Sequence, residues 1–201
     1  MGSMVVASRH LLDVDAELAL SRYRHRVFVD RLGWDIPQTG YSDGGERDQF
    51  DRHDTVYVIR RDTDGTITGC ARLLPTVAPY LLEKVFPELF ESAEIPKSRL
   101  VWEMSRLAVE SGGSSAQFMS GVREIFRAAV VYGRERKVER FVSVSFLAME
   151  RLLRRLGIHA HRAGPPKIVD GVPVIAFWVE LDQQTFTALG LDENGFPPDI
   201  H

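Results

Sequence analysis

A long amphipathic segment between two shorter apolar segments is the feature that most restricts how this 201-residue chain can fold. From Ser115 to about Arg136, apolar side chains recur every three or four residues, which places them on one face of a helix. The apolar segments 100–109 and 140–145 have the length and composition of buried strands. A helix between two strands indicates a crossover connection, and hence a sheet with helices packed on its faces.

Shorter elements extend this arrangement on both sides. Residues 15–32 have the apolar spacing of a helix that ends at Gly33. The β-rich segments 55–61 and 66–74 flank the turn sequence Asp62–Gly65, which indicates an antiparallel hairpin. Further short helices are predicted at 80–85, 88–90 and 148–156, and one further strand is predicted at 172–181. The sequence therefore predicts an α/β fold, a single-domain mixed sheet flanked by helices.

Length and composition are those of one globular domain. We expect a single domain over residues 1–201, in which residues 1–14 are a flexible N-terminus or in part a cloning remnant. The single cysteine, Cys70, cannot form an internal disulfide, which favours a reducing compartment and a cytoplasmic location. No apolar segment approaches the roughly 20 residues of a membrane span. The net charge of −3 argues against a general nucleic-acid binder, so we expect neither membrane nor nucleic acid as a partner.

The common cofactor and metal motifs are missing from the sequence. It contains no Gly-rich dinucleotide or phosphate loop, no His-Glu-x-x-His and no paired cysteines. His159 and His161 alternate as on a strand, but no carboxylate or cysteine stands at ligand spacing, so we interpret them as a solvated face. We therefore expect no metal and no tightly bound cofactor.

Acidic residues, arginines and aromatic residues instead gather in three places. Arg24 and Phe28 are four residues apart and share a helix face, which fits either an ordinary amphipathic helix or a binding site. The long loop 35–54 carries Asp48 and Asp51, whose carboxylates can be solvated, can cap turns or can belong to a site. Two charged residues also interrupt the apolar strand 100–109, where charge is costly unless it is paired or used. These are Glu103 and Arg106.

Taken in order along the chain, these motifs resemble those of the acyl-homoserine-lactone synthase family. The matching segments are Tyr23–Trp34, Asp48–Asp51, Gly69–Thr76, Pro79–Leu82, Phe86–Pro87, Val101–Arg106 and Met149–Arg151. Eight polar or aromatic positions of the family signature are present, namely Arg24, Phe28, Trp34, Asp48, Asp51, Arg72, Glu103 and Arg106. The ordered set is specific, although no single motif would suffice.

The resemblance implies a fold related to the Gcn5-type N-acetyltransferase fold. It also implies two substrates, S-adenosylmethionine as co-substrate and an acyl chain on acyl carrier protein. The products would be an acyl-homoserine lactone, methylthioadenosine and the free carrier protein.

The chemistry of that reaction assigns expected roles to the matched residues. Glu103 is the expected acceptor of the amine proton, and a backbone amide at a strand bulge is an expected oxyanion donor. Arg24 or Arg106 would orient the substrate carboxylate, and Phe28 or Trp34 would face the sulfonium. Two aspartates would either contact substrate or organise the loop by pairing with Arg24, Arg72 or Arg106. They are Asp48 and Asp51.

An acyl tail needs apolar walls, and the residues that flank the matched motifs are candidates, with ordinary core packing as the alternative. The expected acyl-binding residues are Phe86, Met104, Ser105, Ser143, Val144, Phe146, Met149 and Leu152. Family members that use 3-oxo chains often have threonine in the strand where this chain reads Ser143–Ser145. This weakens the 3-oxo case and favours an unsubstituted chain of medium length.

Acyl carrier protein is acidic, so its docking surface should be basic. A cluster of basic residues on the predicted helix 148–156 and beyond it is the candidate, and a solvated helix face is the alternative. The cluster comprises Arg151, Arg154, Arg155 and Lys167.

Two other functions fit part of the same pattern. A Gcn5-type N-acyltransferase using acyl-coenzyme A would share the fold, but the stretch Glu110–Ala116 has glycines without the basic start of a pyrophosphate loop. A non-catalytic module that binds acyl carrier protein is the second alternative. Glu103, Arg106 and Trp34 would have no evident use in such a module.

Overall fold

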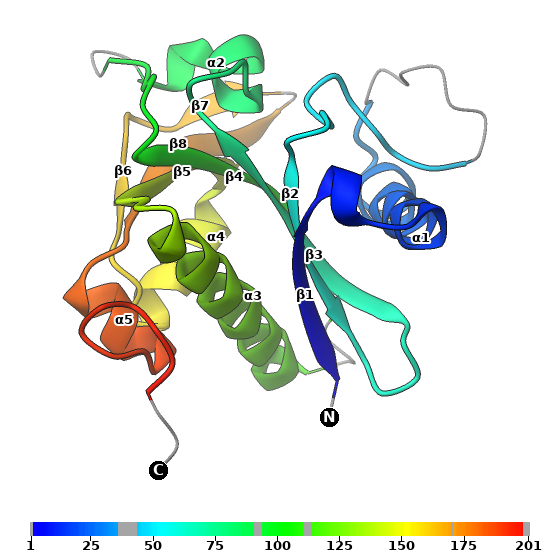
Figure 1. Cartoon of the computed structure of the whole chain (residues 1–201). Coiled ribbons are helices and arrows are strands. Elements are labelled where there is room, and N and C mark those ends of the chain that lie inside the picture. The colour runs from blue at the N-terminus through cyan, green and yellow to red at the C-terminus, as the bar shows by residue number, and fades with distance from the viewer. Residues whose placement is uncertain (1, 36–43, 91–93, 111–113, 170, 199–201) are drawn as a thin grey trace. The chain divides into compact units, whose positions relative to one another are not determined.

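The structure is a computed structural model that describes residues 2–35, 44–90, 94–110, 114–169 and 171–198 of the chain. The chain divides into two units. The first comprises Met1–Leu74 and Arg106–Ile125, and the second comprises Pro75–Ser105 and Phe126–His201. Strand β4 (Val101–Val109) and helix α3 (Ser115–Glu135) each contribute residues to both units (Figure 1).

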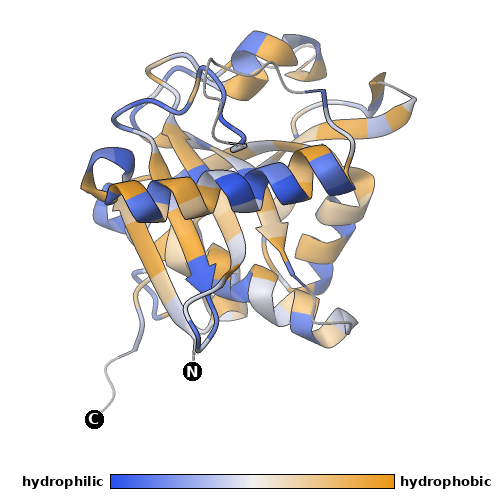
Figure 2. Cartoon of the chain, turned by 90° about the vertical axis from the view of Figure 1, so that its right-hand side faces the viewer, coloured by the Kyte–Doolittle hydropathy of each residue, from blue (hydrophilic) through white to orange (hydrophobic). Residues whose placement is uncertain are grey.

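An antiparallel arrangement of β1 (Ser3–Ser8), β2 (Val56–Arg61) and β3 (Ile67–Pro75) forms the sheet of the first unit. Val58 at the centre of β2 lies opposite Ala71 of β3, which confirms the predicted hairpin. The strands carry mainly hydrophobic residues, as Figure 2 shows. Beyond the hairpin, the backbone N–H of Glu110 donates to the carbonyl oxygen of Thr68 at 2.8 Å, next to the end of β4.

Strand β1 corrects the expectation that residues 1–14 form a flexible N-terminus. Its six residues pair with β2, and the backbone N–H of Arg9 donates to the carbonyl oxygen of Thr55 at 2.7 Å. A short 3₁₀ helix, η1 (Arg9–Leu11), follows directly. The segment has only a few alternating apolar residues, so its strand character depends on hydrogen bonds to a partner that is distant in sequence.

Helix α1 (Val14–Arg24) begins at Asp13, whose carboxylate accepts the backbone N–H of Ala16 at 2.7 Å. It continues as the π-helical segment η2 (His25–Arg31), which the sequence pattern did not predict. The whole helical segment ends before Gly33, which has a φ of +67°, as predicted from the glycine. The wider π-helical turns change which side chains face the sheet, and such segments frequently occur at functional sites.

The hydrophobic core of the first unit lies between this helical segment and the strands. Its buried members are Leu20, Tyr23, Val27, Phe28, Tyr57, Ile59, Ile67, Cys70 and Ala108, with Leu12 and Trp34 packed against them. Full burial of such a large apolar side chain stabilises the fold by roughly 1.5–3 kcal/mol. Two of the predicted site residues, Phe28 and Trp34, are therefore also anchors of the core.

In the second unit, the first residues of β4 pair in parallel with β5 (Arg140–Phe146), with Trp102 opposite Phe141. This parallel pair, joined through α3, confirms the predicted crossover connection. Strand β8 (Val172–Glu180) lies antiparallel to β5 and also pairs with the two shortest strands. Those strands are β6 (Ala160–Arg162) and β7 (Lys167–Val169).

Short helices complete the second unit. They are α2 (Leu81–Val85), the 3₁₀ helix η3 (Pro87–Phe90), α4 (Leu147–Arg155) and α5 (Gln183–Leu189). The first three agree with the predicted positions, whereas α5 was not predicted. Its end signals are nevertheless present, because Asp182 accepts the backbone N–H of Thr185 at 3.1 Å and Gly190 follows with a φ of +66°.

The sequence contains no apolar segment long enough to span a membrane, and the helices of the structure bear on the same point. Among the described residues, no helix combines the length and the apolar character that crossing a membrane would require.

Candidate active site

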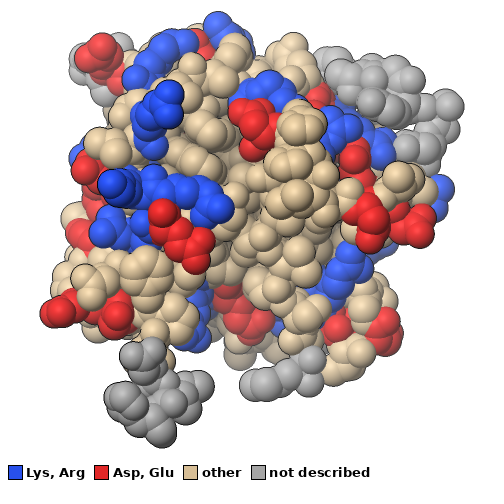
Figure 3. Space-filling view, viewed as in Figure 1, with Lys and Arg blue, Asp and Glu red and all other residues tan. Residues whose placement is uncertain are grey.

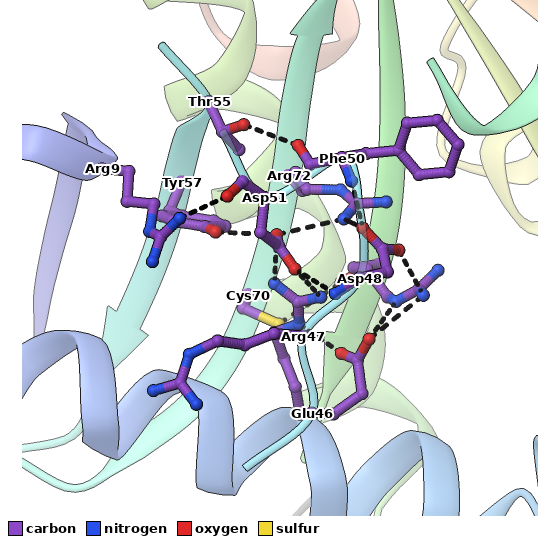
Figure 4. Close-up of polar contacts among 12 residues, drawn as sticks. Arg9, Glu46, Arg47, Asp48, Phe50, Asp51, Thr55, Tyr57, Cys70 and Arg72 are labelled. Carbon is purple, nitrogen blue, oxygen red and sulfur yellow. Dashed lines mark hydrogen bonds and ion pairs between the residues drawn. The ribbon is translucent and has the colours of Figure 1, made fainter. Parts of the chain in front are cut away.

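Six buried charged side chains in the first unit form one hydrogen-bonded cluster, which we call the ion-pair network. They are Arg24, Glu46, Asp48, Asp51, Arg72 and Arg106. The arginines extend from α1, β3 and β4. The carboxylates come from the described part of the loop before β2, and Figure 4 shows them together with Arg72. The network thus brings together, from segments distant in sequence, five of the eight family-signature residues.

Arg24 is fully engaged within the network. Its Nη1 and Nη2 donate to the two carboxylate oxygens of Asp51 at 2.8 and 3.0 Å, and its Nε donates to Glu46 Oε2 at 2.5 Å. The side chain is only 2% exposed. Burial acts to lower the pKa of the Arg24 guanidinium, but the charges of Asp51 and Glu46 outweigh it and raise the pKa well above its usual value.

Both carboxylate oxygens of Asp51 accept more than one hydrogen bond. Besides Arg24, its Oδ1 accepts from the Tyr57 hydroxyl at 2.7 Å and from Arg72 Nη1 at 3.0 Å, and its Oδ2 accepts the backbone N–H of Asp48 at 2.8 Å. Arg9 donates to the backbone oxygen of Asp51. Burial opposes ionisation of this carboxyl, but the charges of Arg24 and Arg72 hold its pKa well below the usual range.

Asp48 links the other two arginines. Its Oδ1 accepts from Arg72 Nη1 at 2.6 Å and from the backbone N–H of Phe50 at 2.9 Å. Its Oδ2 accepts from Arg106 Nη2 at 2.7 Å. The sequence left open whether Asp48 and Asp51 pair with arginines, and the structure confirms that they do.

Arg106 differs from Arg24 in the way it is held. Its Nε and Nη2 donate to Glu46 Oε1 at 3.3 and 3.1 Å, whereas its Nη1 makes no hydrogen bond with the described part of the chain. Burial, together with the positive charge of Arg72, lowers its pKa below the usual value. Arg106 also has a φ of +54°, a left-handed conformation that is unusual for a residue with a side chain.

An aromatic pair lies against the Arg106 guanidinium. The rings of Phe28 and Trp34 stack with centroids 4.9 Å apart and planes inclined by 26°. Arg106 Cζ lies 5.5 Å from the Phe28 centroid and 5.7 Å from the Trp34 centroid, within cation–π range. Phe28 is buried, whereas Trp34 is partly exposed. Only Trp34 therefore retains substantial surface for a ligand.

The three carboxylates of the network approach one another closely enough to hold a metal ion. Glu46, Asp48 and Asp51 each offer an oxygen, and these atoms all lie within 4.8 Å of one another. Each carboxylate, however, already accepts hydrogen bonds from guanidinium groups, so three positive charges balance three negative ones. The chemistry of this set is that of a compensated ion-pair cluster, and a metal would have to displace arginines.

Glu103 lies in the second unit, on the buried first half of β4. Its side chain is 0% exposed, and its Oε2 accepts the backbone N–H of Leu82 at 2.8 Å, in the first turn of α2. Nearby, burial and the charges of Glu83 and Glu103 raise the pKa of the Tyr80 hydroxyl. The carboxylate predicted from an interrupted apolar strand is therefore buried, and one of its oxygens orients the start of α2.

The candidate acyl-binding residues all lie in the second unit, on β4, β5 and α4 and, for Phe86, directly after α2. Met104, Ser105 and Ser143 are buried, and the Ser143 hydroxyl donates to the carbonyl oxygen of Met104 at 2.5 Å. The other candidates are half-buried, unlike the fully buried core around them. They are Phe86, Val144, Phe146, Met149 and Leu152.

The basic docking candidates are less uniform than their spacing on α4 suggests. Arg154 forms an ion pair with the buried Glu150 at 3.0 Å, and Arg162 forms a second one at the same distance. Arg151 and Arg155 are exposed, and Lys167 lies half-buried on β7. Basic and acidic side chains are interspersed over the face shown in Figure 3, without a single dominant sign.

Two residues of these clusters escaped the sequence analysis, and a third was noticed only as part of a matched segment. Glu46 belongs to the ion-pair network, Tyr57 donates to it, and Glu150 of α4 pairs with Arg154 and Arg162. Glu46 stands two residues before Asp48 in the acidic loop, which was a usable signal. Tyr57 looked like an ordinary strand residue, and Glu150 was given no role within the matched segment Met149–Arg151.

Comparison with known sequences gives a family match over most of the chain. Residues 8–189 match the sequence model of a family described as autoinducer synthase. An acyl-homoserine-lactone synthase of Ralstonia nicotianae is 48% identical over 183 residues, which cover 89% of this chain and 87% of that protein.

Comparison with solved structures points the same way. TofI, in a ternary complex with an inhibitor and MTA, is 44% identical with a TM-score of 0.85, over 96% of this chain and 99% of that one. BjaI, a CoA-dependent acyl-homoserine lactone synthase with SAM and isopentyl-CoA, is 25% identical with a TM-score of 0.84, over 100% and 92% of the two chains. An acyl-CoA N-acyltransferase from Pseudomonas aeruginosa, 17% identical with a TM-score of 0.60 over 89% and 99%, shares the fold.

Proposed function

Since the chain belongs to the autoinducer synthase family and is an acyl-homoserine-lactone synthase that makes a quorum-sensing signal, we propose which substrates it uses. They are S-adenosylmethionine and a medium-length, unsubstituted acyl chain on acyl carrier protein. The observation that carries the proposal is Arg106, a buried guanidinium whose Nη1 makes no hydrogen bond with the described residues and which lies beside a partly exposed tryptophan. This combination suits a ligand that has both a carboxylate and a cationic sulfonium.

The reaction has two bond-forming steps. In the first, the amine nitrogen of S-adenosylmethionine attacks the thioester carbon, the carrier thiolate leaves, and the amine proton passes to a base and on to the thiolate. In the second, the carboxylate oxygen attacks the γ-carbon and the bond from that carbon to sulfur breaks. Because the sulfonium leaves as the neutral thioether methylthioadenosine, the enzyme mainly has to fold the substrate.

Arg106 is the residue best suited to orient the substrate carboxylate. Arg24 uses its Nε, Nη1 and Nη2 on Glu46 and Asp51, and its side chain is 2% exposed. Within the described segments, Arg106 leaves Nη1 without a hydrogen bond. An arginine–carboxylate hydrogen bond is charge-assisted and directional, so one free guanidinium nitrogen suffices for orientation. Arg24, Arg72, Asp48 and Asp51 then act as the framework that holds Arg106.

Trp34 is the candidate for the sulfonium contact. Phe28 is 2% exposed and stacks beneath Trp34, so it supports the indole more than it contacts ligand. A cation over an indole face contributes about 0.5–2 kcal/mol. The same aromatic pair already faces Arg106, which indicates that this part of the first unit is suited to positive charge.

Glu103 is the proposed proton acceptor for the first step. Its carboxylate is fully buried in an otherwise apolar strand, where a charge is costly unless it is paired or used. The N–H of Leu82 fixes one oxygen and thereby the plane of the carboxylate. A base with a fixed orientation transfers protons without first having to reorganise.

The left-handed conformation of Arg106 marks an irregularity in β4 and supports the expected oxyanion donor. A strand residue with positive φ interrupts the regular alternation of backbone amides, as at a β-bulge. An amide turned out of the ladder in this way can donate to the oxygen of a tetrahedral intermediate. We assign this role to the backbone beside Arg106.

Ser143 supports an unsubstituted acyl chain. Its hydroxyl proton is donated to the carbonyl oxygen of Met104, so it is not available for a keto group on the third carbon. The half-buried Val144, Phe146 and Met149 supply apolar surface for the tail. Acyl-CoA remains the competing donor, because BjaI is described as CoA-dependent. The exposed Arg151 and Arg155 favour the acidic carrier protein.

The test is a reconstituted reaction with the purified chain, S-adenosylmethionine and a series of acyl thioesters. Each acyl group is offered both on carrier protein and on coenzyme A, and the lactones are identified by mass spectrometry. We expect the highest kcat/KM with a saturated, medium-length chain on carrier protein. A preference for 3-oxo chains would contradict the role of Ser143, and equal use of acyl-CoA would contradict the proposed donor.

A further inference from the structure

Glu46 is buried between two arginines of the ion-pair network that come from different elements. Its Oε2 accepts from Arg24 Nε at 2.5 Å, and its Oε1 accepts from Arg106 Nε and Nη2 at 3.3 and 3.1 Å. The side chain is 0% exposed. The residue belongs to no matched motif, yet it is the carboxylate through which α1 and β4 are joined.

Glu46 contacts one side of the Arg106 guanidinium, and this determines which of its nitrogen atoms can bind a ligand. Nε and Nη2 form one edge of the guanidinium, and Glu46 binds that edge. Asp48 takes a second hydrogen bond from Nη2, so that, among the residues that the structure describes, none accepts a hydrogen bond from Nη1. A guanidinium turned to present a different edge to Glu46 would no longer direct Nη1 to the same place.

The backbone around Glu46 lies close to α1. The N–H of Glu46 donates to the carbonyl oxygen of Ser21 at 2.9 Å. A β-carbon at the preceding residue, Gly45, would lie 2.3 Å from Ser21 Oγ and 2.7 Å from Ser21 Cβ. Because such contacts cannot be accommodated, only glycine allows the chain to come this near to the helix. The position of Glu46 is therefore fixed through its main chain as well as its side chain.

Electrostatics favour the same arrangement. Burial opposes ionisation of Glu46, but the charges of Arg24 and Arg106 outweigh it and lower the pKa of the carboxyl. The carboxylate stays charged, so its contact with Arg106 persists over the neutral pH range.

From this geometry we propose that Glu46 is a positioning residue for the reaction: it holds Arg106 so that Nη1 points to the carboxylate of S-adenosylmethionine. This inference rests on the proposed function, in which Arg106 orients that carboxylate. Glu46 itself does not touch the substrate. Its effect should therefore fall on the binding of S-adenosylmethionine and not on acyl transfer.

The experiment measures KM for S-adenosylmethionine, KM for the acyl thioester, kcat and Tm in the variant Glu46→Asp. Aspartate keeps the charge of the network but is one methylene shorter, so it cannot keep the contacts to both arginines. We expect KM for S-adenosylmethionine to rise about tenfold, with the other two kinetic parameters within about threefold of the parent enzyme. Unchanged KM values, or a parallel loss in all parameters together with Tm, would overturn the proposal.

Glu150→Asp is the matched control. Glu150 is also a buried glutamate bound by two arginines, Arg154 and Arg162, but it lies on α4 of the second unit. This control should leave KM for S-adenosylmethionine unchanged. A rise equal to that of Glu46→Asp would mean that any buried glutamate has the effect, and the positioning role would be rejected.

Arg106→Lys separates the inference from the proposed function. Lysine keeps a positive charge but has one nitrogen in place of the three of a guanidinium. It cannot bind the network and the substrate carboxylate in the same way, so KM for S-adenosylmethionine should rise. If it rises in Arg106→Lys but not in Glu46→Asp, the positioning role fails and the proposed role of Arg106 stands. If it stays unchanged in Arg106→Lys, the proposed role of Arg106 itself fails. A Glu46→Asp chain that does not fold would assign Glu46 to folding and also overturn the inference.

Discussion

Asp51 is a signature residue whose contacts favour a structural role over a catalytic one. Five hydrogen bonds from Arg24, Arg72, Tyr57 and the backbone of Asp48 converge on its two oxygens. A carboxylate with two oxygens has about four lone-pair sites, so these donors saturate it. No capacity remains to bind substrate or accept a proton, and Asp51 is better understood as the hub of the ion-pair network.

Replacing that hub should destabilise the fold. Asp51→Asn removes the negative charge that faces Arg24 and Arg72, and it places amide hydrogens against donors. Breaking a buried ion pair by removing one partner costs about 3–5 kcal/mol. We expect a loss of this size in the free energy of unfolding at pH 7, measured by urea denaturation. A loss below about 1 kcal/mol would mean that the network relaxes without Asp51.

The same residue makes stability depend on acid. The folded-state pKa of Asp51 lies below its unfolded value of about 3.9, so its contribution is fully present above that value and is lost as pH falls through the folded pKa. Glu46 adds a contribution of the same sign. The parent chain should therefore lose stability between about pH 5 and pH 2. The Asp51→Asn variant should show a shallower loss over this interval.

Glu103 differs from Asp51 because its proposed role is chemical. It lies on an otherwise mainly apolar strand, and its Oε2 accepts the backbone N–H of Leu82 at 2.8 Å. The carbonyl oxygen of glutamine can also accept that N–H. Glu103→Gln should therefore preserve the fold while removing the proposed base.

We expect Glu103→Gln to lower kcat by about 10²- to 10⁴-fold, the usual contribution of a general base. The measurement is kcat between pH 6 and 9 with saturating substrates. If Glu103 accepts the proton, the variant should also regain part of its rate as hydroxide concentration rises. A variant with the Tm of the parent and a near-normal kcat at all pH values would show that another group accepts the proton.

At the scale of elements, helix ends and turns were the features best predicted from the sequence. Gly33 was expected at a helix end, and it has the positive φ that such a position requires; Gly157, directly after the predicted helix 148–156, also has a positive φ. Helix α3 followed from apolar periodicity, and β4 and β5 followed from the length and composition of two apolar segments. Strand β1 and the π-helical η2 were missed, because pairing and packing with distant residues produce them.

Helix α3 offers a test of this local control. Lys137, just beyond its end, has a φ of +62°, and its N–H donates to the carbonyl oxygen of Arg134 at 3.0 Å. A left-handed conformation costs a residue with a β-carbon about 1–2 kcal/mol, part of which glycine returns as entropy of the unfolded chain. Lys137→Gly should therefore stabilise the protein by up to about 1 kcal/mol.

The control is Lys137→Ala, which removes the charge and the long side chain but keeps the β-carbon. Thermal unfolding of the three proteins checks the prediction. We expect only the glycine variant to have a higher Tm. An increase of the same size in the alanine variant would assign the effect to charge or side-chain length.

At the scale of the whole molecule, the family motifs predicted more of the candidate site than any physical pattern did. The signature residues Arg24, Arg72 and Arg106 lie far apart in sequence, and only the folded chain shows that they share carboxylate partners. Glu46, which completes the set, was not identified: its place two residues before Asp48 pointed to the same loop, but not to burial against two arginines. Charges that are buried by tertiary packing cannot be told from solvated ones by sequence alone.

The distribution of surface charge bears on the proposed carrier-protein partner. Glu150 of α4 forms ion pairs with Arg154 and Arg162, whereas Arg151 and Arg155 of α4 are exposed. Of the predicted docking residues on α4, these two are therefore the better candidates. The chain as a whole has a net charge of −3, so attraction to an acidic carrier protein must come from a local patch.

Reversing that patch should impair use of the carrier protein specifically. In the double variant Arg151→Glu and Arg155→Glu, kcat/KM for acyl carrier protein should fall about tenfold or more at low salt, because like charges now oppose association. The parent enzyme should lose activity with carrier-bound substrate as salt rises, whereas the variant should depend on salt much less. The variant Arg61→Glu and Lys137→Glu makes the same change in net charge elsewhere and should behave like the parent. With a small acyl thioester that lacks the carrier, all three enzymes should be equally active, and a loss there would place Arg151 or Arg155 in the acyl site.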